Sequence, residues 1–311
     1  MAITSYGVIA ALGKALADTP KSNALSSLAP KFASQLPAGD TEKMDFLGMV
    51  PGLREWLGPR SAKRPLEHKY GITLKKFEST IDLPLDWINN AKNDQIQGLI
   101  AGLALRYNQW YGSRVARLIN VAETELCFDG AAFFATTHSW GDSGTISNRT
   151  TFNAAVSNEP TANEAASAIV TAVSAMTAFR DDRGEPINEG MTDLIVLAPA
   201  GSVIAASAMQ AIKEKNLDTG TGVRANPVMG LEQNLRFMSS ARLTQNRLYL
   251  INGTAGAIPF AFLENMQDFK KSSKAADSDF EHDNDAWQFG IKAVGEAGFG
   301  RFTDALNIEF N

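Results

Sequence analysis

Between residues 76 and 85, apolar and polar side chains alternate with a period of two. The two sides of this alternation are Phe77, Ser79, Ile81, Leu83 and Leu85 against Lys76, Glu78, Thr80 and Asp82. This is the period of a β-strand, so the pattern predicts a strand with one solvated face. Ile72 and Leu74 begin the same alternation out of phase, which predicts a β-bulge at Lys75–Lys76.

From about Asp94 to Glu123 the pattern becomes helical. One broad apolar stripe contains Ile96, Leu99, Ile100, Leu103, Tyr107, Trp110, Val115, Leu118, Ile119 and Ala122. A helix of roughly 28 residues would be about 42 Å long, which is far above the usual length. Gly98, Gly102 and Gly112 each weaken such a helix by up to about 1 kcal/mol relative to Ala. Packing against other elements must therefore hold it.

The remainder of the chain predicts a mixture of helices and strands. The expected elements are a helix near 163–179, a buried strand at 194–197, a helix at 201–215, and strands near 236–239, 247–251, 260–263 and 287–291. The Gly/Thr/Asn-rich segment 216–230 and the polar segment 270–285 are predicted to be loops. Residues 161–257 therefore read as a compact α/β unit, and the whole chain belongs to the α+β class.

The first 85 residues have too few apolar side chains to form a core of their own. Residues 1–44 contain one short helical pattern before Pro20, so we expect an N-terminal arm that lies on another surface. Residues 45–85 are predicted to form a long two-stranded projection, and a lone hairpin is barely stable in water. Arg54-Glu55-Trp56 falls on this projection. Trp and Arg dominate protein–protein interfaces, so the tripeptide is either a local packing anchor or a contact with another chain.

The balance of charge is acidic, with 29 Lys and Arg against 34 Asp and Glu and a formal net charge of −5. Broad binding to a phosphate backbone needs clustered Lys and Arg, so this balance argues against it. The single cysteine, Cys127, excludes an intrachain disulfide, and its apolar neighbours predict a small buried side chain. The first residues lack a signal-peptide pattern, and no segment approaches the roughly 18 uncharged apolar residues of a membrane span. We expect a soluble protein that is not secreted.

Candidate metal and cofactor sites are absent from the sequence. His68, His138 and His282 lie far apart and only one Cys is present, so no metal site is expected. Gly295, Gly298 and Gly300 do not have the spacing of a dinucleotide-binding loop. The sequence therefore predicts no cofactor.

Two short patterns resemble catalytic motifs. Asp218-Thr219-Gly220 matches the signature of aspartic proteases, but a charged segment precedes it where that chemistry needs an apolar strand, which favours a surface loop. Asp129, His138 and Ser139 could be combined into a triad, but residues on one short loop seldom have that geometry. We expect His138 to pack or hydrogen-bond beneath Phe133 and Phe134, and no catalytic site.

Several short motifs, in order along the chain, resemble those of the major head proteins of Mu-like phages. They are Pro51–Gly58, which reads Pro-Gly-Leu-Arg-Glu-Trp-Leu-Gly, the strand Phe77–Ile81, the central group Cys127–Gly130 with Phe133-Phe134 and Thr137-His138, and the C-terminal Ile258–Phe262, Phe280–Asp285 and Gly298–Gly300. Ser139 stands where the family pattern has proline, which loosens the turn. The resemblance is weakest in residues 1–45 and 200–235.

The resemblance implies the shell-forming fold of tailed phages, herpesvirus capsid floors and encapsulins. In that fold residues 1–44 would be the N-terminal arm and 45–85 the extended hairpin loop that overlaps a neighbouring subunit. Residues 86–160 would form the peripheral domain with its long spine helix, 161–257 the axial domain, and 258–311 the C-terminal strands of the peripheral domain. The residues expected at the interface between subunits are Arg54, Glu55, Trp56, Lys69 and Phe77, and those expected as the structural family signature are Asp129, Gly130, Phe133, Phe134 and His138.

By the same resemblance, the chain would be a major capsid protein whose hexamers and pentamers enclose double-stranded DNA in an icosahedral head, without sequence-specific binding. Scaffold, protease and portal proteins would be partners during assembly in the bacterial host cytoplasm, decoration proteins are a further candidate, and the mature location would be the virion. No membrane partner is expected. Three alternatives remain open: an encapsulin-type shell protein, a different virion component such as a tail protein, and a hydrolase that uses Asp129/His138 or Asp218.

Overall fold

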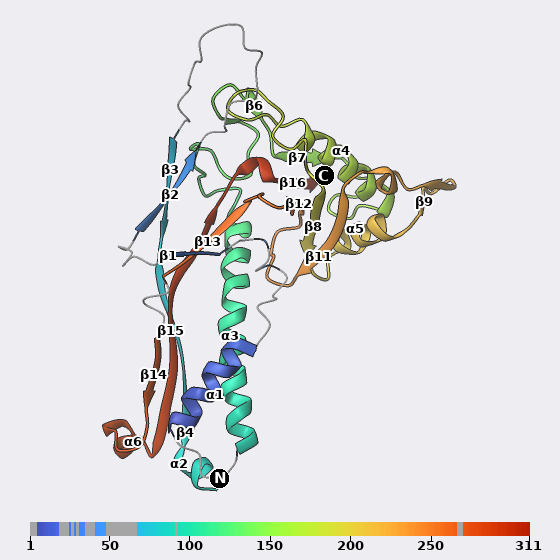
Figure 1. The fold of residues 1–311 in the computed structure, drawn as a ribbon. Helices are drawn as coiled ribbons and strands as arrows, with labels where there is room; N and C mark the ends of the chain where they lie inside the picture. Colours follow the sequence, from blue (N-terminus) through green and yellow to red (C-terminus); the bar gives the residue numbers. More distant parts are fainter. Residues whose placement is uncertain are drawn as a thin grey trace. The chain divides into compact units, whose positions relative to one another are not determined.

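The computed structural model describes residues 5–18, 25, 28, 31–34, 41–47, 67–90, 93–265 and 270–311, and Arg54, Glu55 and Trp56 lie outside these ranges. The chain divides into two compact units. Unit 1 comprises Met1–Glu42, Ile72–Val115 and Phe262–Gly298, and unit 2 comprises Lys43–Gly71, Ala116–Ala261 and Phe299–Asn311. Each unit has its own sheet and its own helices (Figure 1).

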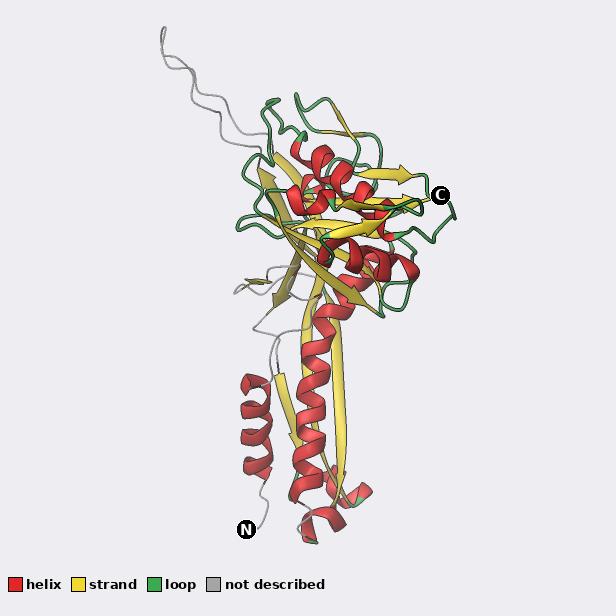
Figure 2. Ribbon diagram, turned by 90° about the vertical axis from the view of Figure 1, so that its right-hand side faces the viewer, coloured by secondary structure: helices red, strands yellow, loops and turns green. Residues whose placement is uncertain are grey.

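Unit 1 is built around the 14-residue strand β15 (Ala286–Phe299). β4 (Lys75–Pro84) pairs antiparallel with one edge of β15, and β14 (Lys270–Lys274) pairs antiparallel with the other edge. β13 (Phe260–Asn265) also joins β15, and β1 (Lys31–Ser34) pairs parallel with β13. The long helix α3 (Asn93–Asn120) runs along these strands, as Figure 2 shows.

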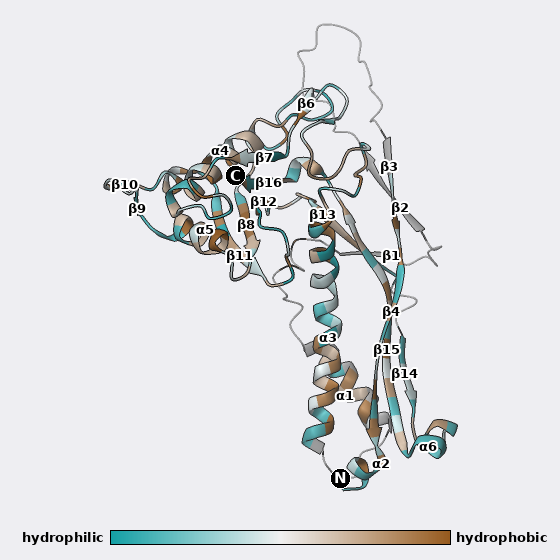
Figure 3. Ribbon diagram, turned by 180° about the vertical axis from the view of Figure 1, so that it is seen from behind, coloured by the Kyte–Doolittle hydropathy of each residue, from teal (hydrophilic) through white to brown (hydrophobic). Residues whose placement is uncertain are grey.

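The core of unit 1 lies between α3, the sheet and the N-terminal helix α1 (Ser5–Asp18). It consists of Val8, Leu12, Leu83, Ile96, Ile100, Leu103, Trp287, Phe289 and Ile291. Two short helices, α2 (Leu85–Asn89) after β4 and α6 (Asp279–Asn284) before β15, complete the unit. In Figure 3, α1 is coloured mainly as hydrophobic and β14 mainly as hydrophilic, which fits a packed helix and a solvated edge strand.

Unit 2 contains a five-stranded sheet in the order β11-β8-β12-β16-β7. Its strands are β7 (Arg149–Phe152), β8 (Asp193–Pro199), β11 (Asn234–Ser240), β12 (Leu248–Asn252) and β16 (Ala305–Phe310). α4 (Ala162–Thr177) and α5 (Val203–Lys213) pack against this sheet and against each other. α4 begins with a capping box, in which Thr161 and Glu164 satisfy each other's backbone N–H groups.

Among the described residues, unit 2 also contains three small two-stranded sheets. β2 (Thr41–Leu47) pairs with β3 (Glu67–Thr73), β5 (His138–Ser139) pairs with β6 (Thr145–Ile146), and β9 (Asn216–Asp218) pairs with β10 (Val223–Ala225). Short 3₁₀ helices occupy Pro227–Gly230 and Phe302–Asp304.

The long helical and buried strand predictions are confirmed. The helix expected over about 94–123 is α3, the helices expected near 163–179 and 201–215 are α4 and α5, and the strands near 194–197, 236–239 and 247–251 are β8, β11 and β12. Of these elements, β8 and β12 are buried along most of their length and α4 and α5 each bury one apolar face, whereas β11 is only partly buried and Leu99 on the apolar stripe of α3 is exposed.

Both loop predictions are wrong in part. Segment 216–230 contains the β9–β10 hairpin, because Gly220 adopts a φ of +80° at its turn and Leu217 is buried beneath it. Segment 270–285 contains β14 and α6. β14 is an edge strand with every side chain exposed, so its polar composition resembles that of a loop.

The two-stranded projection expected for residues 45–85 is divided between two partners. β3 pairs with β2, but β4 pairs with β15 over ten residue pairs. β4 pairs with β15 because this pairing buries Leu83 of β4 in the core of unit 1, among apolar side chains of α3 and β15. The break between β3 and β4 falls at Leu74, one residue before the predicted bulge.

Candidate functional site

Of the residues expected as the family signature, four have buried side chains in one cluster of unit 2 (Asp129, Phe133, Phe134 and His138), and Gly130 is exposed in the adjoining turn. Asp129 Oδ2 lies 2.6 Å from His138 Nδ1. The other ring nitrogen, Nε2, lies 3.1 Å from both the Phe133 carbonyl oxygen and Asn148 Oδ1. The His138 ring stacks on Phe302 with its centroid 4.0 Å away. Since the side chains of His138 and Asp129 are 0% and 2% exposed, the whole arrangement is closed to solvent.

Asn148 connects this cluster to two stretches of backbone, around Phe133–Ala135 and at Phe302. Its Nδ2 donates to the carbonyl oxygens of Phe133 at 2.7 Å and Phe302 at 3.1 Å. Its Oδ1 accepts from the backbone N–H of Ala135 at 3.0 Å. Both His138 nitrogens face oxygen atoms, and the shortest of these contacts is the one between Nδ1 and the Asp129 carboxylate. The cluster therefore joins the loop after α3 to the C-terminal segment of unit 2.

The neighbours of Asp129 shift the pKa of its carboxyl group. Burial by itself would raise the pKa of Asp129, but the hydrogen bond and the charge of His138, with the backbone N–H of Ala131, lower that pKa below its usual value. Gly130 has a φ of +82°, so the turn that carries Asp129 uses a left-handed conformation that favours glycine. Each signature residue thus has a structural explanation.

The aromatic plug is confirmed as core. Phe133 and Phe134 are fully buried, and Phe133 stacks on Phe299 with ring centroids 4.7 Å apart. Cys127 is buried beside them, its Sγ directed at the Gly300 carbonyl, and burial raises the pKa of its thiol far above the usual value. The expectation that His138 hydrogen-bonds to the plug is also confirmed, through the Phe133 carbonyl.

The arrangement gives the hydrolase alternative no support. Ser139 is exposed, whereas both nitrogens of His138 are engaged by Asp129, Phe133 and Asn148, so no hydroxyl is positioned for activation. Asp218 Oδ1 accepts from the backbone N–H of Gly220 at 2.8 Å in the β9–β10 turn, which is a turn-forming role. Within the described ranges no group of three metal-ligating side chains occurs, and no helix there is long and apolar enough to span a membrane.

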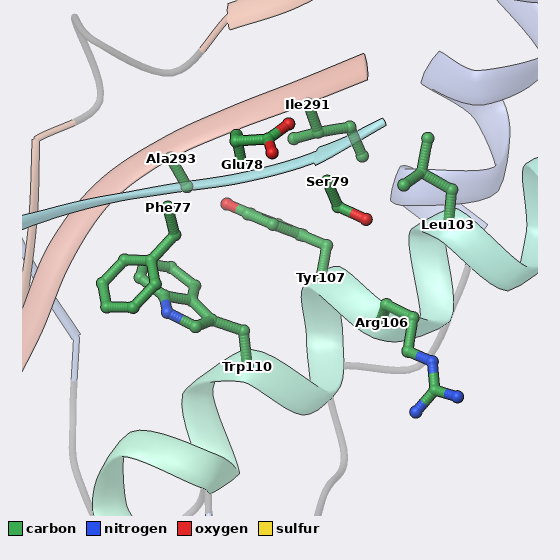
Figure 4. A pocket seen from close by; sticks show the side chains of 9 residues that line it. All are labelled: Phe77, Glu78, Ser79, Leu103, Arg106, Tyr107, Trp110, Ile291 and Ala293. Carbon is green, nitrogen blue, oxygen red and sulfur yellow. The ribbon is translucent and has the colours of Figure 1, made fainter. Parts of the chain in front are cut away.

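Of the predicted interface residues, Phe77 is the one whose side chain is described. It lies on the α3 side of β4, with its ring centroid 5.1 Å from that of Trp110 and the Arg114 guanidinium 5.0 Å from its face. Only the backbone of Lys69 is described, within β3. Beside Phe77, a shallow cavity of about 150 Å³ opens between α3 and the sheet (Figure 4). Its lining includes Leu103, Tyr107, Trp110, Ile291 and Ala293.

Sequence reasoning missed two polar anchors that fix α3 to the sheet of unit 1. Arg114 forms a bidentate pair with the buried Glu296 of β15, at 2.7 and 2.6 Å. Tyr107 Oη donates to Glu264 Oε1 of β13 at 2.6 Å, and Tyr111 Oη lies 2.8 Å from Glu264 Oε2. The available signal was a lone glutamate inside each apolar strand, since a buried carboxylate requires a partner.

The comparisons with known proteins agree with this geometry. The family described as Mu-like prophage major head subunit gpT matches residues 13–166, about half of the chain. A relative named Mu-like prophage FluMu major head subunit, from Haemophilus influenzae, is 28% identical over 96 residues. That match covers 31% of this chain and 31% of the relative, so the chain spans about a third of the curated relative that it matches.

Solved structures share the fold along nearly the whole chain. The bacteriophage JBD30 procapsid covers 99% of this chain and 76% of its own, with 19% identity and a TM-score of 0.56. The mature capsid of bacteriophage PhiM1 covers 92% and 86%, with 11% identity and a TM-score of 0.54. A virus-like particle from Pyrococcus furiosus covers 98% and 100%, with 8% identity and a TM-score of 0.54. The fold is the α+β fold of phage capsid proteins, and residues 13–166 match the family of Mu-like prophage major head subunits.

Proposed function

We propose that this chain is a major capsid protein whose copies assemble, as hexamers and pentamers, into the icosahedral head of a tailed, Mu-like phage and enclose its double-stranded DNA. The observation that carries the proposal is the likeness to the JBD30 procapsid over 99% of the chain at a TM-score of 0.56. The family match over residues 13–166 supports the Mu-like assignment.

The described architecture suits a shell subunit. Two of its buried polar clusters, around His138 and Glu296, connect elements inside one chain and present no reacting group to solvent. The formal net charge of −5 suits a surface that surrounds DNA without binding its phosphates broadly. A shell needs many moderate contacts, of which a standard one buries about 1,600 Å² in total. The assignments of 1–44 as arm, 45–85 as overlapping loop, 86–160 with 258–311 as peripheral domain and 161–257 as axial domain are part of the proposal.

The partners of assembly are also part of the proposal. Scaffold, protease and portal proteins would act during assembly in the host cytoplasm, and decoration proteins could bind the finished virion. No cofactor is included in the proposal.

Electron microscopy of the purified protein tests the proposal directly. The expected result is closed polyhedral particles that sediment far faster than the subunit. A protein that stays monomeric at every concentration, alone and with its scaffold, would contradict the proposal, and open tubes would favour a tail component instead.

A cellular shell is a second candidate, favoured by one observation. The chain covers the full length of the Pyrococcus furiosus virus-like particle subunit at a TM-score of 0.54. Shells that form from this chain alone and hold a host protein inside would favour that candidate. Shells that require a phage scaffold and take up DNA would favour the phage head.

A further inference from the structure

The sheet of unit 1 ends in two outer strands: β14 carries three lysines, whereas β4 carries Glu78 and Asp82 after Lys75 and Lys76 at its N-terminal end. β4 is the outer strand on one side of β15 and β14 the outer strand on the other. Glu78 and Asp82 of β4 are exposed, and so are Lys270 and Lys274 of β14. Among the described residues none of these four side chains has an ion-pair partner within 4.0 Å.

The register places these charges at matching heights. Lys292 of β15 is the Cα partner of both Glu78 and Lys270, and Gln288 is the partner of both Asp82 and Lys274. Residues four apart along a strand are about 14 Å apart. The two carboxylates on one edge therefore have the same spacing and the same level as the two ammonium groups on the other.

All four charges project from the same face of the sheet, opposite α3. Directly paired residues of an antiparallel sheet share a face. Thr80 and Ser272 confirm this for the row between the charges, because a Cβ added to Gly290 would lie 2.9 Å from both of their hydroxyl oxygens. Phe77, at an odd position of β4, packs instead on Trp110 of α3.

We propose that the β14 edge of one copy docks against the β4 edge of a second copy, with Lys270 beside Glu78 and Lys274 beside Asp82. This inference rests on the proposed shell function and names one contact within it. The two edges are different surfaces, so the contact is head-to-tail, and such contacts generate rings when their rotation closes. Both strands run antiparallel to β15, so a copy displaced sideways would align both charge pairs at once.

Lysines on an edge strand often serve only to prevent strand pairing. That role would explain β14, but it does not explain carboxylates at the same two heights on the opposite edge. Complementary charge patches steer association and exclude wrong partners, and opposed like charges cost several kcal/mol.

Charge reversal tests the contact. Lys270→Glu with Lys274→Glu places carboxylates opposite Glu78 and Asp82, and Glu78→Lys with Asp82→Lys places ammonium groups opposite Lys270 and Lys274. Each double variant should raise the protein concentration needed for particle formation by at least about tenfold. The quadruple variant restores opposite charges with the edges exchanged, and it should assemble like the wild type. Lys213→Glu with Lys215→Glu is the control for the β14 variant, since it makes the same change in net charge at exposed positions of unit 2.

The outcomes separate the possibilities. Double variants that assemble normally would overturn the contact, and so would a quadruple variant that fails to recover or a control that fails equally. A wild type that forms no particles would overturn the proposed function and this inference together. Circular dichroism melting checks that each variant folds, and Lys270→Gln with Lys274→Gln replaces any charge reversal that does not.

A disulfide test reports the contact independently of assembly yield. Cys127 is buried and is the single native cysteine, so the background is low. Asp82→Cys with Lys274→Cys should give a ladder of disulfide-linked copies on mild oxidation, and Asp82→Cys alone should not. Absence of the ladder in assembled particles would contradict the contact.

Discussion

At the scale of single residues, the stability of this chain depends on polar side chains enclosed by apolar ones. His138, Asp129 and Asn148 are buried together, and Glu296 is buried with Arg114. Each set is satisfied by hydrogen bonds, and removing one member leaves the others unpaired in a medium where an unpaired charge is costly.

His138→Ala should lower the free energy of unfolding of the subunit by about 3–5 kcal/mol, because it leaves the Asp129 carboxylate buried without its partner. Urea unfolding measures the loss. His282→Ala is the matched control: His282 is exposed in α6, and its replacement should change stability by less than about 0.5 kcal/mol. Equal effects of the two substitutions would show that the cluster does not stabilise the fold.

Acidification should weaken the same cluster. The pKa of Asp129 is lower in the folded state than in the unfolded chain, so its contribution is fully present above the unfolded value of about 3.9 and is lost as the pH falls through the folded value. The free energy of unfolding of the wild type should therefore fall more steeply below about pH 5 than that of Asp129→Asn. Parallel pH profiles for the two proteins would contradict this assignment.

The Arg114–Glu296 pair should behave as a coupled unit. Arg114→Met should cost about 3–5 kcal/mol, since it leaves the buried Glu296 with the half-exposed Lys75 as its remaining ionic partner, and Glu296→Gln should cost less because Arg114 is partly exposed. Glu296→Leu with Arg114→Met removes both charges, so it should cost clearly less than the sum of the single changes. Strictly additive losses in a double-mutant cycle would show that the two side chains act independently.

At the scale of elements, close backbone approach decides where glycine is required. A Cβ at Gly295 of β15 would lie 2.6 Å from the Leu263 carbonyl oxygen and 3.1 Å from the Trp110 ring. At Gly102 of α3, nothing lies within 4 Å. Glycine is required at Gly295, where the backbone of β13 and the Trp110 ring approach closely, but not at Gly102.

Gly295→Ala should therefore destabilise unit 1 by about 1–3 kcal/mol through overpacking between β15, β13 and α3. Gly102→Ala should stabilise the subunit by about 0.5–1 kcal/mol, because alanine is the better helix former at an exposed helical position. Thermal unfolding followed by circular dichroism compares the two. A stabilised Gly295→Ala protein would show that the strand separates from α3 without cost.

At the scale of the whole molecule, assembly is the property to measure. Trp56 lies outside the described residues, and its role as an anchor on a neighbouring subunit remains a prediction from residue type. Trp56→Ala should give a folded, soluble subunit that forms no shells, whereas Lys63→Ala in the same segment should assemble normally. Negative-stain microscopy and sedimentation decide the matter, and shells of normal size from Trp56→Ala would remove the anchor hypothesis.

The amino-acid sequence by itself determined the long helix α3, the helices and central strands of the α/β unit, and the aromatic plug. Those features depend on local periodicity over many residues or on a dense apolar run, and both can be read without knowing which elements meet. The order of short motifs also pointed to the family that residues 13–166 match.

Only the tertiary structure decided which strands pair and which polar groups meet. β4 joins β15 more than 200 positions further along the chain, and Asn148, Glu264 and Glu296 acquire their roles from partners on other elements. The hydrophobic periodicity of the sequence did not predict β14, because an edge strand whose side chains are all exposed has no alternation of apolar and polar residues. Strand pairing and burial depend on which apolar faces pack together, and these faces often come from distant parts of the sequence. A local sequence pattern does not specify the packing partner.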